Sequence, residues 1–326
     1  MIVITGASGL VGGNLARALL ALGHAVRTMV HRDRRALEGL DVESVSADLG
    51  DPASLEEAFR GAQVVYHLAS AISIRMDNWD EMERVNVDGT RNVLAACLRA
   101  NVRRLVYFSS IHAYRQAPFD QALDEDRPLL TDGNIPPYER SKAAAELLVR
   151  AASDRGLDTV IIIPTAILGP YDYRPSYIGQ ALELLRRGRI PALVRGGYDW
   201  VDVRDVVAGA IQAERLAPRG GRYILSGHWR TVREVAQVAA QISGRLAPPF
   251  TVPLLLAALV APMLEKMAYL NGAQPLYTRA MLHALRSNRQ VSHARAAREL
   301  SYAPRPFEQT IADTLHWFAS QQGSRP

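Results

Sequence analysis

A tyrosine and a lysine four residues apart carry the clearest chemical signal in the sequence. Tyr138 and Lys142 lie in the stretch YERSK, which opens a run of good helix formers, so both side chains should share one helix face. A tyrosine near its free pKa of about 10 is a poor proton donor or acceptor at neutral pH. A neighbouring ammonium stabilises the phenolate and lowers that pKa, so the pair suits general acid/base catalysis.

Lysine is rare in this chain, which makes the pair more informative. Only Lys142 and Lys266 are lysines among the 38 basic residues. A compact ammonium bonds ribose hydroxyls with a geometry that a planar guanidinium does not reproduce, so we expect Lys142 to contact a nucleotide ribose. An exposed Tyr and a solvated Lys that meet by chance would show the same spacing.

Two serines follow a predicted strand that ends at Phe108. Ser110 should reach the same sheet edge as Tyr138 and bond either a substrate carbonyl oxygen or the Tyr138 phenol. Ser109 should point to the opposite face if the strand continues. Neither serine lies in the glycine elbow of a hydrolytic nucleophile.

The histidines do not indicate a metal centre. His67 and His112 are predicted to be packing or pocket residues. No spacing of His, Cys and carboxylate residues matches a set of metal ligands, so we predict no metal site.

The element that would position a cofactor beside these groups opens the chain. An apolar run at residues 2–4, a glycine-rich turn and a helix from Asn14 follow one another. Glycines spaced GxxGxxG allow a tight turn and a close approach of backbone N–H groups to a pyrophosphate, which then faces the helix N-terminus. A turn that only caps a helix would contain the same glycines. The predicted dinucleotide contacts here are Gly6, Ser8, Gly9, Leu10, Val11 and Gly12.

The end of the second predicted strand bears on the choice between NAD and NADP. An acidic residue at this point bonds the adenosine ribose 2′-hydroxyl, whereas arginine suits a 2′-phosphate. The strand over 25–30 is followed by His31 and Arg32, and Asp33 comes late, so the sequence favours NADP over NAD. Further predicted cofactor contacts follow other strands and are Asp48, Leu49, Leu68, Ala69, Ser70, Pro164, Ala166 and Ile167.

Strand and helix patterns alternate through the first half of the chain, which predicts an α/β fold with a doubly wound parallel sheet, a Rossmann fold. We assign residues 1–168 to this dinucleotide-binding domain and expect 198–217 to pack back onto it. Residues 169–197 and 218–326 should form a smaller, mostly helical substrate-binding domain. The Pro- and Asp-rich stretch 116–137 is predicted to be a long surface loop.

Composition indicates a soluble globular protein. With one cysteine and a strand that starts at residue 2, no disulfide or signal peptide is expected, which favours the cytoplasm. The net charge is +5, but the arginines are scattered without interleaved aromatic residues, so nucleic acid is not an expected partner. Residues 248–264 are apolar but contain four prolines and are too few to span a bilayer. They predict a buried or substrate-lining helix.

Taken together, the motifs resemble the extended short-chain dehydrogenase/reductase superfamily, the NAD-dependent epimerase/dehydratase group. The segments 198–206 and 223–227 look closest to its dihydroflavonol-reductase-like and 3β-hydroxysteroid-dehydrogenase-like branch. The matching stretches are TGASGLVGG at 5–13, Asp48-Leu49, His67-Leu68-Ala69, NVDGTRNV at 86–93, YFSS at 107–110 with Tyr114, YERSK at 138–142, AILGP at 166–170 and WVDVRDV at 200–206.

This resemblance implies a role for each catalytic candidate. Tyr138 would be the general acid/base, Lys142 its electrostatic partner and nicotinamide-ribose ligand, Ser110 the carbonyl binder and Asn86 a supporting residue. A hydride would pass between the nicotinamide of NADP or NAD and a substrate carbon. The resemblance also implies a homodimer packed through helices at 80–101 and 138–152. One departure is Ile163, where the family usually has arginine.

Three functions are compatible with these residues. The first is an NADP(H)-dependent carbonyl reductase or alcohol dehydrogenase that acts on a small, fairly apolar substrate. The second is a sugar-nucleotide epimerase or dehydratase with tightly held NAD, for which Arg174, Arg195 and Arg279 could bind a diphosphate. The third is a dinucleotide sensor without catalysis, which the Tyr138–Lys142 pair disfavours.

Overall fold

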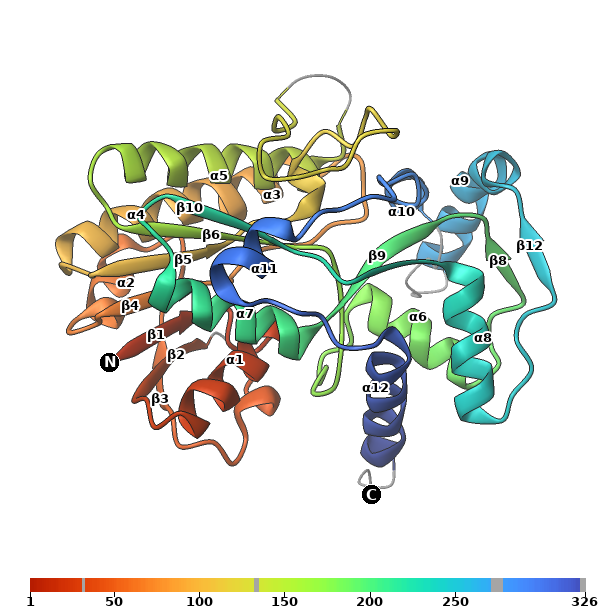
Figure 1. Ribbon diagram of the computed structural model, residues 1–326, viewed down its shortest axis with the longest axis horizontal. Coiled ribbons are helices and arrows are strands. Elements are labelled where there is room, and N and C mark those ends of the chain that lie inside the picture. Colours follow the sequence, from red (N-terminus) through yellow and green to blue (C-terminus); the bar gives the residue numbers. More distant parts are fainter. Residues whose placement is uncertain (31–32, 132–134, 271–277, 323–326) are drawn as a thin grey trace.

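A seven-stranded parallel sheet forms the centre of the computed structural model, which describes residues 1–30, 33–131, 135–270 and 278–322 (Figure 1). The strand order β10-β6-β5-β4-β1-β2-β3 confirms the predicted doubly wound fold. The strands are β1 (Ile2–Thr5), β2 (Val26–Val30), β3 (Glu43–Ser46), β4 (Val64–His67), β5 (Arg104–Phe108), β6 (Thr159–Pro164) and β10 (Gly221–Leu225).

Helices cover both faces of the sheet because both faces of its central strands are apolar. Alternate strand residues such as Ile4 and Tyr66 belong to a core shared with α1 (Leu10–Ala21), α7 (Val203–Leu216) and α11 (Ala294–Leu300). Their neighbours Val65 and Leu105 belong to the opposite core. That core is covered by α2 (Pro52–Phe59), α4 (Gly89–Arg99) and α5 (Pro137–Asp154).

The long helix predicted over 80–101 is interrupted. A short α3 (Trp79–Met82) and α4 flank a π-helical segment, Glu83–Asp88. Such π turns interrupt regular helices most often at functional sites. Here the segment contains Asn86, one of the predicted site residues.

A smaller layer extends beyond one side of the sheet (Figure 1). A three-stranded sheet has the order β11-β9-β7, and β12 pairs with β8. The strands are β7 (Ala166–Leu168), β8 (Ala192–Val194), β9 (Gly197–Asp202), β11 (His228–Thr231) and β12 (Phe250–Val252). The helices of this part are α6 (Tyr177–Arg186), α8 (Val232–Ser243), α9 (Leu254–Leu270), α10 (Arg279–Ala284) and α12 (Phe307–Gln322).

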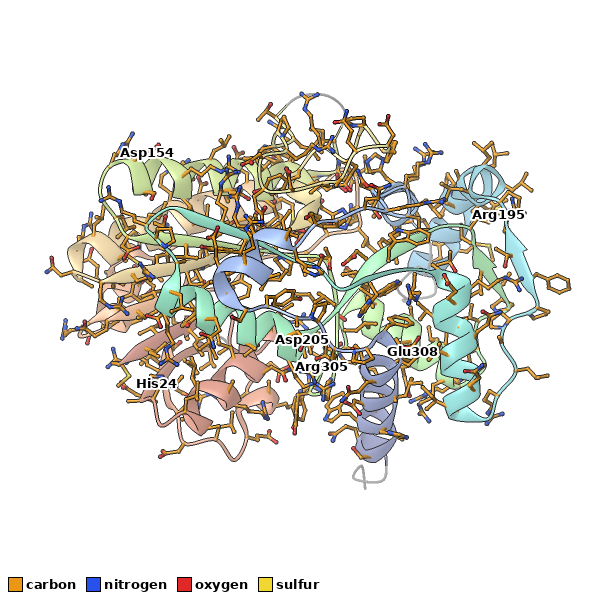
Figure 2. All side chains as sticks on the ribbon, in the orientation of Figure 1. His24, Asp154, Arg195, Asp205, Arg305 and Glu308 are labelled. Atoms are coloured by element: carbon orange, nitrogen blue, oxygen red, sulfur yellow. The ribbon has the colours of Figure 1, made fainter. Side chains whose placement is uncertain are left out.

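One ion pair fastens the C-terminal segment to the layer that covers the main sheet. Asp205 of α7 accepts hydrogen bonds from the backbone N–H and the guanidinium of Arg305, which lie beside it in Figure 2. The pair connects α7 to the segment that leads into α12.

The apolar helix α9 corrects a sequence prediction. Residues 248–264 were expected to be buried or to line the substrate site, but Leu255 and Leu259 of α9 are 72% and 76% exposed, and Pro262 is the residue of this stretch among the described lining of the hollow discussed below. The helix packs through a narrow face instead, with Ala257 and Ala261 buried. Hydropathy alone could not reveal this, because the sequence is apolar on every side of the helix. Among the described helices, none has the length and apolar character needed to cross a bilayer.

Candidate active site

Two glycines of the first turn are required by packing. Gly6 adopts φ +72°, and a Cβ on it would lie 2.6 Å from the Ala69 backbone nitrogen. A Cβ on Gly12 would lie 2.3 Å from the Gly6 carbonyl oxygen. Neither position can hold a side chain unless the backbone moves. These glycines therefore allow β1, α1 and the loop after β4 to pack closely against one another.

The third glycine leaves space that the chain itself does not fill. A Cβ on Gly9 would meet only the Gly6 carbonyl oxygen, at an ordinary 3.5 Å. Gly9 is the N-cap of α1, where no side chain caps the helix and no acidic residue lies in the first turn. An open helix N-terminus above a glycine fits the pyrophosphate of a dinucleotide. When bound, NAD(P) would supply or accept the hydride through its nicotinamide.

The predicted 2′-phosphate contacts His31 and Arg32 lie outside the described residues. The neighbouring Asp33 is held by Arg35, which donates to both of its carboxylate oxygens at 3.0 and 2.6 Å. These hydrogen bonds lower the pKa of Asp33 to about 2, and the nearby Arg174 lowers it further. The carboxylate is therefore already neutralised by a basic partner.

The remaining predicted cofactor residues lie at or just beyond the carboxyl ends of parallel strands, the edge where open α/β sheets bind ligands. Leu68 and Ala69 follow β4, Pro164 ends β6, and Ala166 and Ile167 lie in β7. Ser70 donates to Asn86 at 3.0 Å. Asp48 and Leu49 follow β3 and also have structural contacts. Asp48 Oδ1 accepts a hydrogen bond from the Gly50 backbone N–H, and the Leu49 carbonyl oxygen accepts one from the Asn92 side chain.

Ser110 and Tyr138 come together at the end of β5. The Ser110 side chain lies near Tyr138, which is in the first turn of α5. Burial raises the pKa of Tyr138 to about 12, although the nearby Ser110 hydroxyl acts in the opposite direction. The predicted lowering of this pKa is therefore wrong for this structure, because burial dominates and the charge of Glu139 raises the pKa as well.

Lys142 lies one helical turn further along α5 and is buried. Its ammonium donates to the Phe108 carbonyl oxygen at 2.5 Å and lies 4.9 Å from the centre of the Tyr107 ring. Burial lowers the pKa of Lys142 to about 8, while Glu146 acts against this shift. The ammonium is thus fixed at the end of β5, beside the serines that follow it.

Ser109 and Ser110 have separate tasks. Ser109 Oγ donates to Glu146 at 2.5 Å, and the Tyr114 hydroxyl donates to the other carboxylate oxygen at 2.6 Å. Arg150 completes this buried cluster through an ion pair to Glu146. Ser109 is therefore part of the contact between β5 and α5, and only Ser110 reaches Tyr138.

Asn86 connects three segments of the site. Its Oδ1 accepts from the Ala71 backbone N–H at 2.7 Å and from Ser70. Its Nδ2 donates to the Ala71 carbonyl at 2.9 Å and to Ser141 Oγ at 2.9 Å. The π segment thereby fixes the loop after β4 against the helix that carries Tyr138.

A directed chain of hydrogen bonds passes through His67. Thr90 Oγ donates to the Asn86 carbonyl, which only accepts, so Thr90 must accept from His67 Nε2–H. His67 Nδ1 is then unprotonated and accepts from Thr5 Oγ at 2.8 Å. Burial, aided by the charge of Lys142, lowers the pKa of His67 to about 3, which agrees with a neutral ring.

Sequence reasoning did not identify Glu139 as part of the site. Its carboxylate lies 3.7 Å from His112 Nδ1 and 3.9 Å from His283 Nε2. Burial raises the pKa of Glu139 to about 8 and lowers that of His112 to about 4. A glutamate directly after Tyr138 was the only signal, and nothing in the sequence placed His283 of α10 nearby. Within the described ranges, no group of His, Cys and carboxylate residues could hold a metal.

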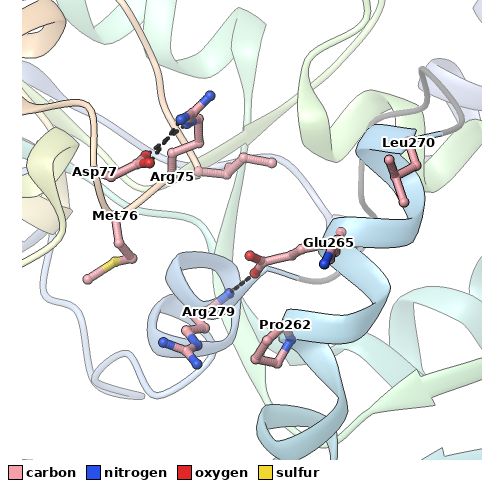
Figure 3. Close-up of a pocket in the computed structure, with 9 residues that line it drawn as sticks. Arg75, Met76, Asp77, Pro262, Glu265, Leu270 and Arg279 are labelled. Atoms are coloured by element: carbon pink, nitrogen blue, oxygen red, sulfur yellow. Dashed lines mark hydrogen bonds and ion pairs between the residues drawn. The ribbon is translucent and has the colours of Figure 1, made fainter.

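A hollow of about 670 Å³ lies between the segment after β4 and helices α9 and α10 (Figure 3). Its charged rim includes the Arg75–Asp77 ion pair and Glu265, which accepts from the Arg279 backbone N–H. Of the three arginines considered for a sugar diphosphate, Arg279 alone is among the described lining residues. The apolar lining consists of Ile74, Met76, Pro262 and Leu270.

Comparisons with known proteins agree with this geometry. Residues 2–224 match the model of the NAD dependent epimerase/dehydratase family. The chain is 36% identical to sterol demethylase protein B of Methylococcus capsulatus, over 97% of each chain. It is 29% identical to 4-hydroxy-2-methyl-3-oxo-4-farnesyl-3,4-dihydroquinoline-1-oxide ketoreductase of Stigmatella aurantiaca, over 99% of this chain and 98% of the relative.

A solved structure shows the same similarity in three dimensions. The crystal structure of gox2253 superposes with a TM-score of 0.86 at 31% identity and covers 98% of both chains. The family match spans the sheet, the glycine-rich turn and the segment from Ser110 to Lys142. The chain therefore belongs to the NAD-dependent epimerase/dehydratase family of extended short-chain dehydrogenases/reductases and is an NAD(P)-dependent enzyme.

Proposed function

We propose that this protein is an NADP(H)-dependent carbonyl reductase, or an alcohol dehydrogenase in the reverse direction, for a fairly apolar substrate. The observation that carries the proposal is the approach of Ser110 to Tyr138 at the end of β5, where the buried Lys142 ammonium is bonded to the Phe108 carbonyl oxygen. This arrangement offers a proton donor, a second hydroxyl and a fixed positive charge at one edge of the sheet.

Each of these residues has a distinct task in carbonyl reduction. The raised pKa of Tyr138 keeps the phenol protonated at neutral pH, so it can donate its proton to the substrate oxygen as the carbonyl carbon gains a hydride. Ser110 donates to the same oxygen and orients the carbonyl. The Lys142 ammonium stabilises the phenolate that is left, and proton uptake from solvent restores the phenol.

We place the apolar part of the substrate in the hollow, which α10 connects to the Tyr138 region because this helix contributes Arg279 to the lining and His283 beside Glu139. Ile74, Met76, Pro262 and Leu270 offer more contact to a hydrocarbon skeleton than to a sugar diphosphate. Two of the relatives are named for a sterol and for a farnesyl-bearing ketone, which agrees with this choice. The sugar-nucleotide alternative predicts that the purified protein contains bound NAD and is stabilised by UDP- or TDP-sugars.

Our NADP preference rests on the ion pair between Asp33 and Arg35. A carboxylate occupied by two donor groups is poorly placed to bond the 2′-hydroxyl of NAD, and Arg35 and Arg174 add positive charge for a 2′-phosphate. Arg35→Ala frees Asp33 and should reduce NADPH affinity more than NADH affinity. Titration of both cofactors measures the ratio, and an unchanged ratio would count against this assignment.

We also propose a cytoplasmic homodimer that packs through 80–101 and 138–152. Leu98 of α4 and Leu147 of α5 are 58% and 44% exposed on these helices. Leu98→Asp with Leu147→Asp should convert the dimer to a monomer in light scattering. Leu22→Asp with Leu216→Asp, two exposed leucines elsewhere, is the matched control.

A panel of ketones and aldehydes tests the proposed reaction directly. NADPH should be consumed with apolar carbonyl compounds, and Tyr138→Phe should abolish turnover while NADPH still binds. Full activity of Tyr138→Phe would remove the phenol from the mechanism. Failure of every carbonyl compound, together with protection by UDP-sugars, would favour the sugar-nucleotide alternative.

A further inference from the structure

An apolar stripe runs along the outer side of α9. Positions four residues apart share one side of a helix, and here such positions carry large apolar side chains that face solvent. They include Leu255, Leu259, Met263, Met267 and Leu270, whose exposed fractions are 72, 76, 62, 51 and 77%. Soluble proteins seldom expose a contiguous apolar surface of this kind unless it binds something.

The excess positive charge of the chain is concentrated around this helix. Residues 228–289 contain seven Lys and Arg but only two Asp and Glu, a net charge of +5. The whole chain also carries +5, so the remaining residues are balanced. The apolar stripe therefore belongs to a segment with a net positive charge, which a negatively charged surface would attract.

Basic residues flank both ends of the stripe. Lys266 lies on α9 itself and, with Arg279 of α10, lines the hollow that also contains Leu270. At the other end, Arg233 donates to Thr251 Oγ in β12, beside the 69% exposed Phe250. Figure 1 shows β12, α9 and α10 together at the end of the molecule away from the N-terminal strand.

The hollow continues the apolar surface on its other side. Ile72 and Met76, from the segment after β4, are 59% and 41% exposed, and Met76 lines the hollow opposite Pro262 and Leu270. Apolar side chains on both sides of the cavity, between the charged groups of its rim, offer a lipophilic molecule a path with little exposure to water.

We propose that the α9 stripe docks this protein onto the surface of a bilayer that contains anionic lipids. The apolar side chains enter the boundary between headgroups and acyl chains, and the surrounding basic residues contact the headgroups. The helix lies on the membrane and does not cross it. Docking places the mouth of the hollow at the lipid surface.

Co-sedimentation with vesicles tests the proposal. The full chain should bind vesicles of phosphatidylcholine mixed with phosphatidylserine. It should bind much less to vesicles of phosphatidylcholine alone. Leu255→Gln with Leu259→Gln should reduce the partition coefficient by at least about tenfold, because two leucines no longer enter the interface. Leu22→Gln with Leu216→Gln, leucines outside this segment that are 55% and 60% exposed, should leave binding unchanged.

The charge contribution is tested separately. Arg233→Gln with Lys266→Gln should weaken binding to the anionic vesicles severalfold, and added salt should have the same effect. Arg155→Gln with Arg219→Gln removes two exposed arginines outside residues 228–289 and serves as the control. Equal losses in both pairs would mean that general electrostatic attraction, not this surface, drives binding.

Two results would overturn the proposal. One is the absence of vesicle binding by a folded wild-type chain. The other is a dimer, seen by sedimentation velocity without lipid, that Leu255→Gln with Leu259→Gln dissociates, because the stripe would then contact a second copy.

The proximity of the hollow to lipid leads to a kinetic test that rests on the proposed function. The Leu255→Gln and Leu259→Gln variant should reduce a long-chain ketone dissolved in vesicles more slowly than wild type, yet reduce a short water-soluble ketone normally. Vesicle binding is measured without turnover, so failure of the reductase proposal cannot be confused with failure of docking.

Discussion

The Lys142 ammonium and the Phe108 carbonyl oxygen are 2.5 Å apart. Phe108 is the last residue of β5, and Lys142 lies in α5, so this hydrogen bond fixes the helix against the strand end that continues into Ser109 and Ser110. The main sheet therefore holds in place the ammonium that we propose assists Tyr138.

The first prediction concerns the pH dependence of reduction. Burial lowers the pKa of Lys142 to about 8, so the ammonium is present below this pH and lost above it, while Tyr138, with its pKa at about 12, stays protonated. We expect kcat/KM for a ketone to be constant below about pH 8 and to fall above it. Lys142→Arg should remove this fall at a lower overall rate, because a guanidinium keeps its proton. Arg155→Gln, at the far end of α5, should keep the wild-type profile, and a flat wild-type profile would contradict the role of Lys142.

The two serines allow a matched test of function against stability. Ser110→Ala should lower kcat by about 10²-fold, since a hydroxyl that positions the carbonyl oxygen is lost. Ser109→Ala should keep kcat but lower the free energy of unfolding by about 1–3 kcal/mol, since Glu146 loses a buried donor. Steady-state kinetics and urea unfolding distinguish the two. If Ser109→Ala loses activity and Ser110→Ala does not, the assignment of the serines is reversed.

The glycines of the first turn should also differ in their effects. Gly9→Ala has room for its Cβ and should fold, but the methyl group lies where the pyrophosphate is expected and should weaken dinucleotide binding at least about tenfold. Gly12→Ala places a Cβ 2.3 Å from the Gly6 carbonyl oxygen and should destabilise the fold by about 1–3 kcal/mol. Fluorescence titration with NADPH and thermal unfolding measure the two effects. Unweakened binding by Gly9→Ala would show that the dinucleotide does not use this space.

Glu139 should make stability depend on pH. Its pKa in the folded chain is about 8, above the usual 4.5, so between these values the folded state keeps a proton that the unfolded state has lost. The free energy of unfolding should therefore fall as pH rises through this window, by up to about 1.4 kcal/mol per pH unit. The pKa values of His112 and His283 are lowered, so these histidines make the free energy of unfolding rise with pH, but only below about pH 6.5.

Urea unfolding between pH 6.5 and 8 tests this effect above the range of Asp172 and Asp199, whose raised pKa values are about 6, and Glu125, whose pKa burial also raises, is common to wild type and variant. Glu139→Gln should flatten the slope in this range. Retention of the full slope in the variant would show that another group is responsible.

Local patterns made most of the main sheet predictable. The glycine turn, the strand ends and the YERSK helix start depend on residues close together in sequence, and the structure has the corresponding strands and helices within a few residues of the expected bounds. The position of β10 beside β6 was not predictable, because strand neighbours are chosen by long-range packing that one sequence does not display.

The site was predictable only where the residues lie on recognisable motifs. The spacing of Tyr138 and Lys142 and the position of Ser110 indicated their shared sheet edge. The approach of His283 to Glu139 depends on how α10 packs, and the burial that raises the Tyr138 pKa depends on the whole surrounding structure. The exposure of α9 was missed for a related reason. An apolar sequence does not show which side of the helix packs against the rest of the protein.

The contact between Gly6 and Ala69 has a consequence for how this chain can change over evolution. A side chain at position 6 would enter the backbone of the loop after β4, a segment that starts more than sixty residues later. A substitution at this glycine can persist only if the path of that loop shifts at the same time. Natural variants of this protein should therefore change both segments together or neither.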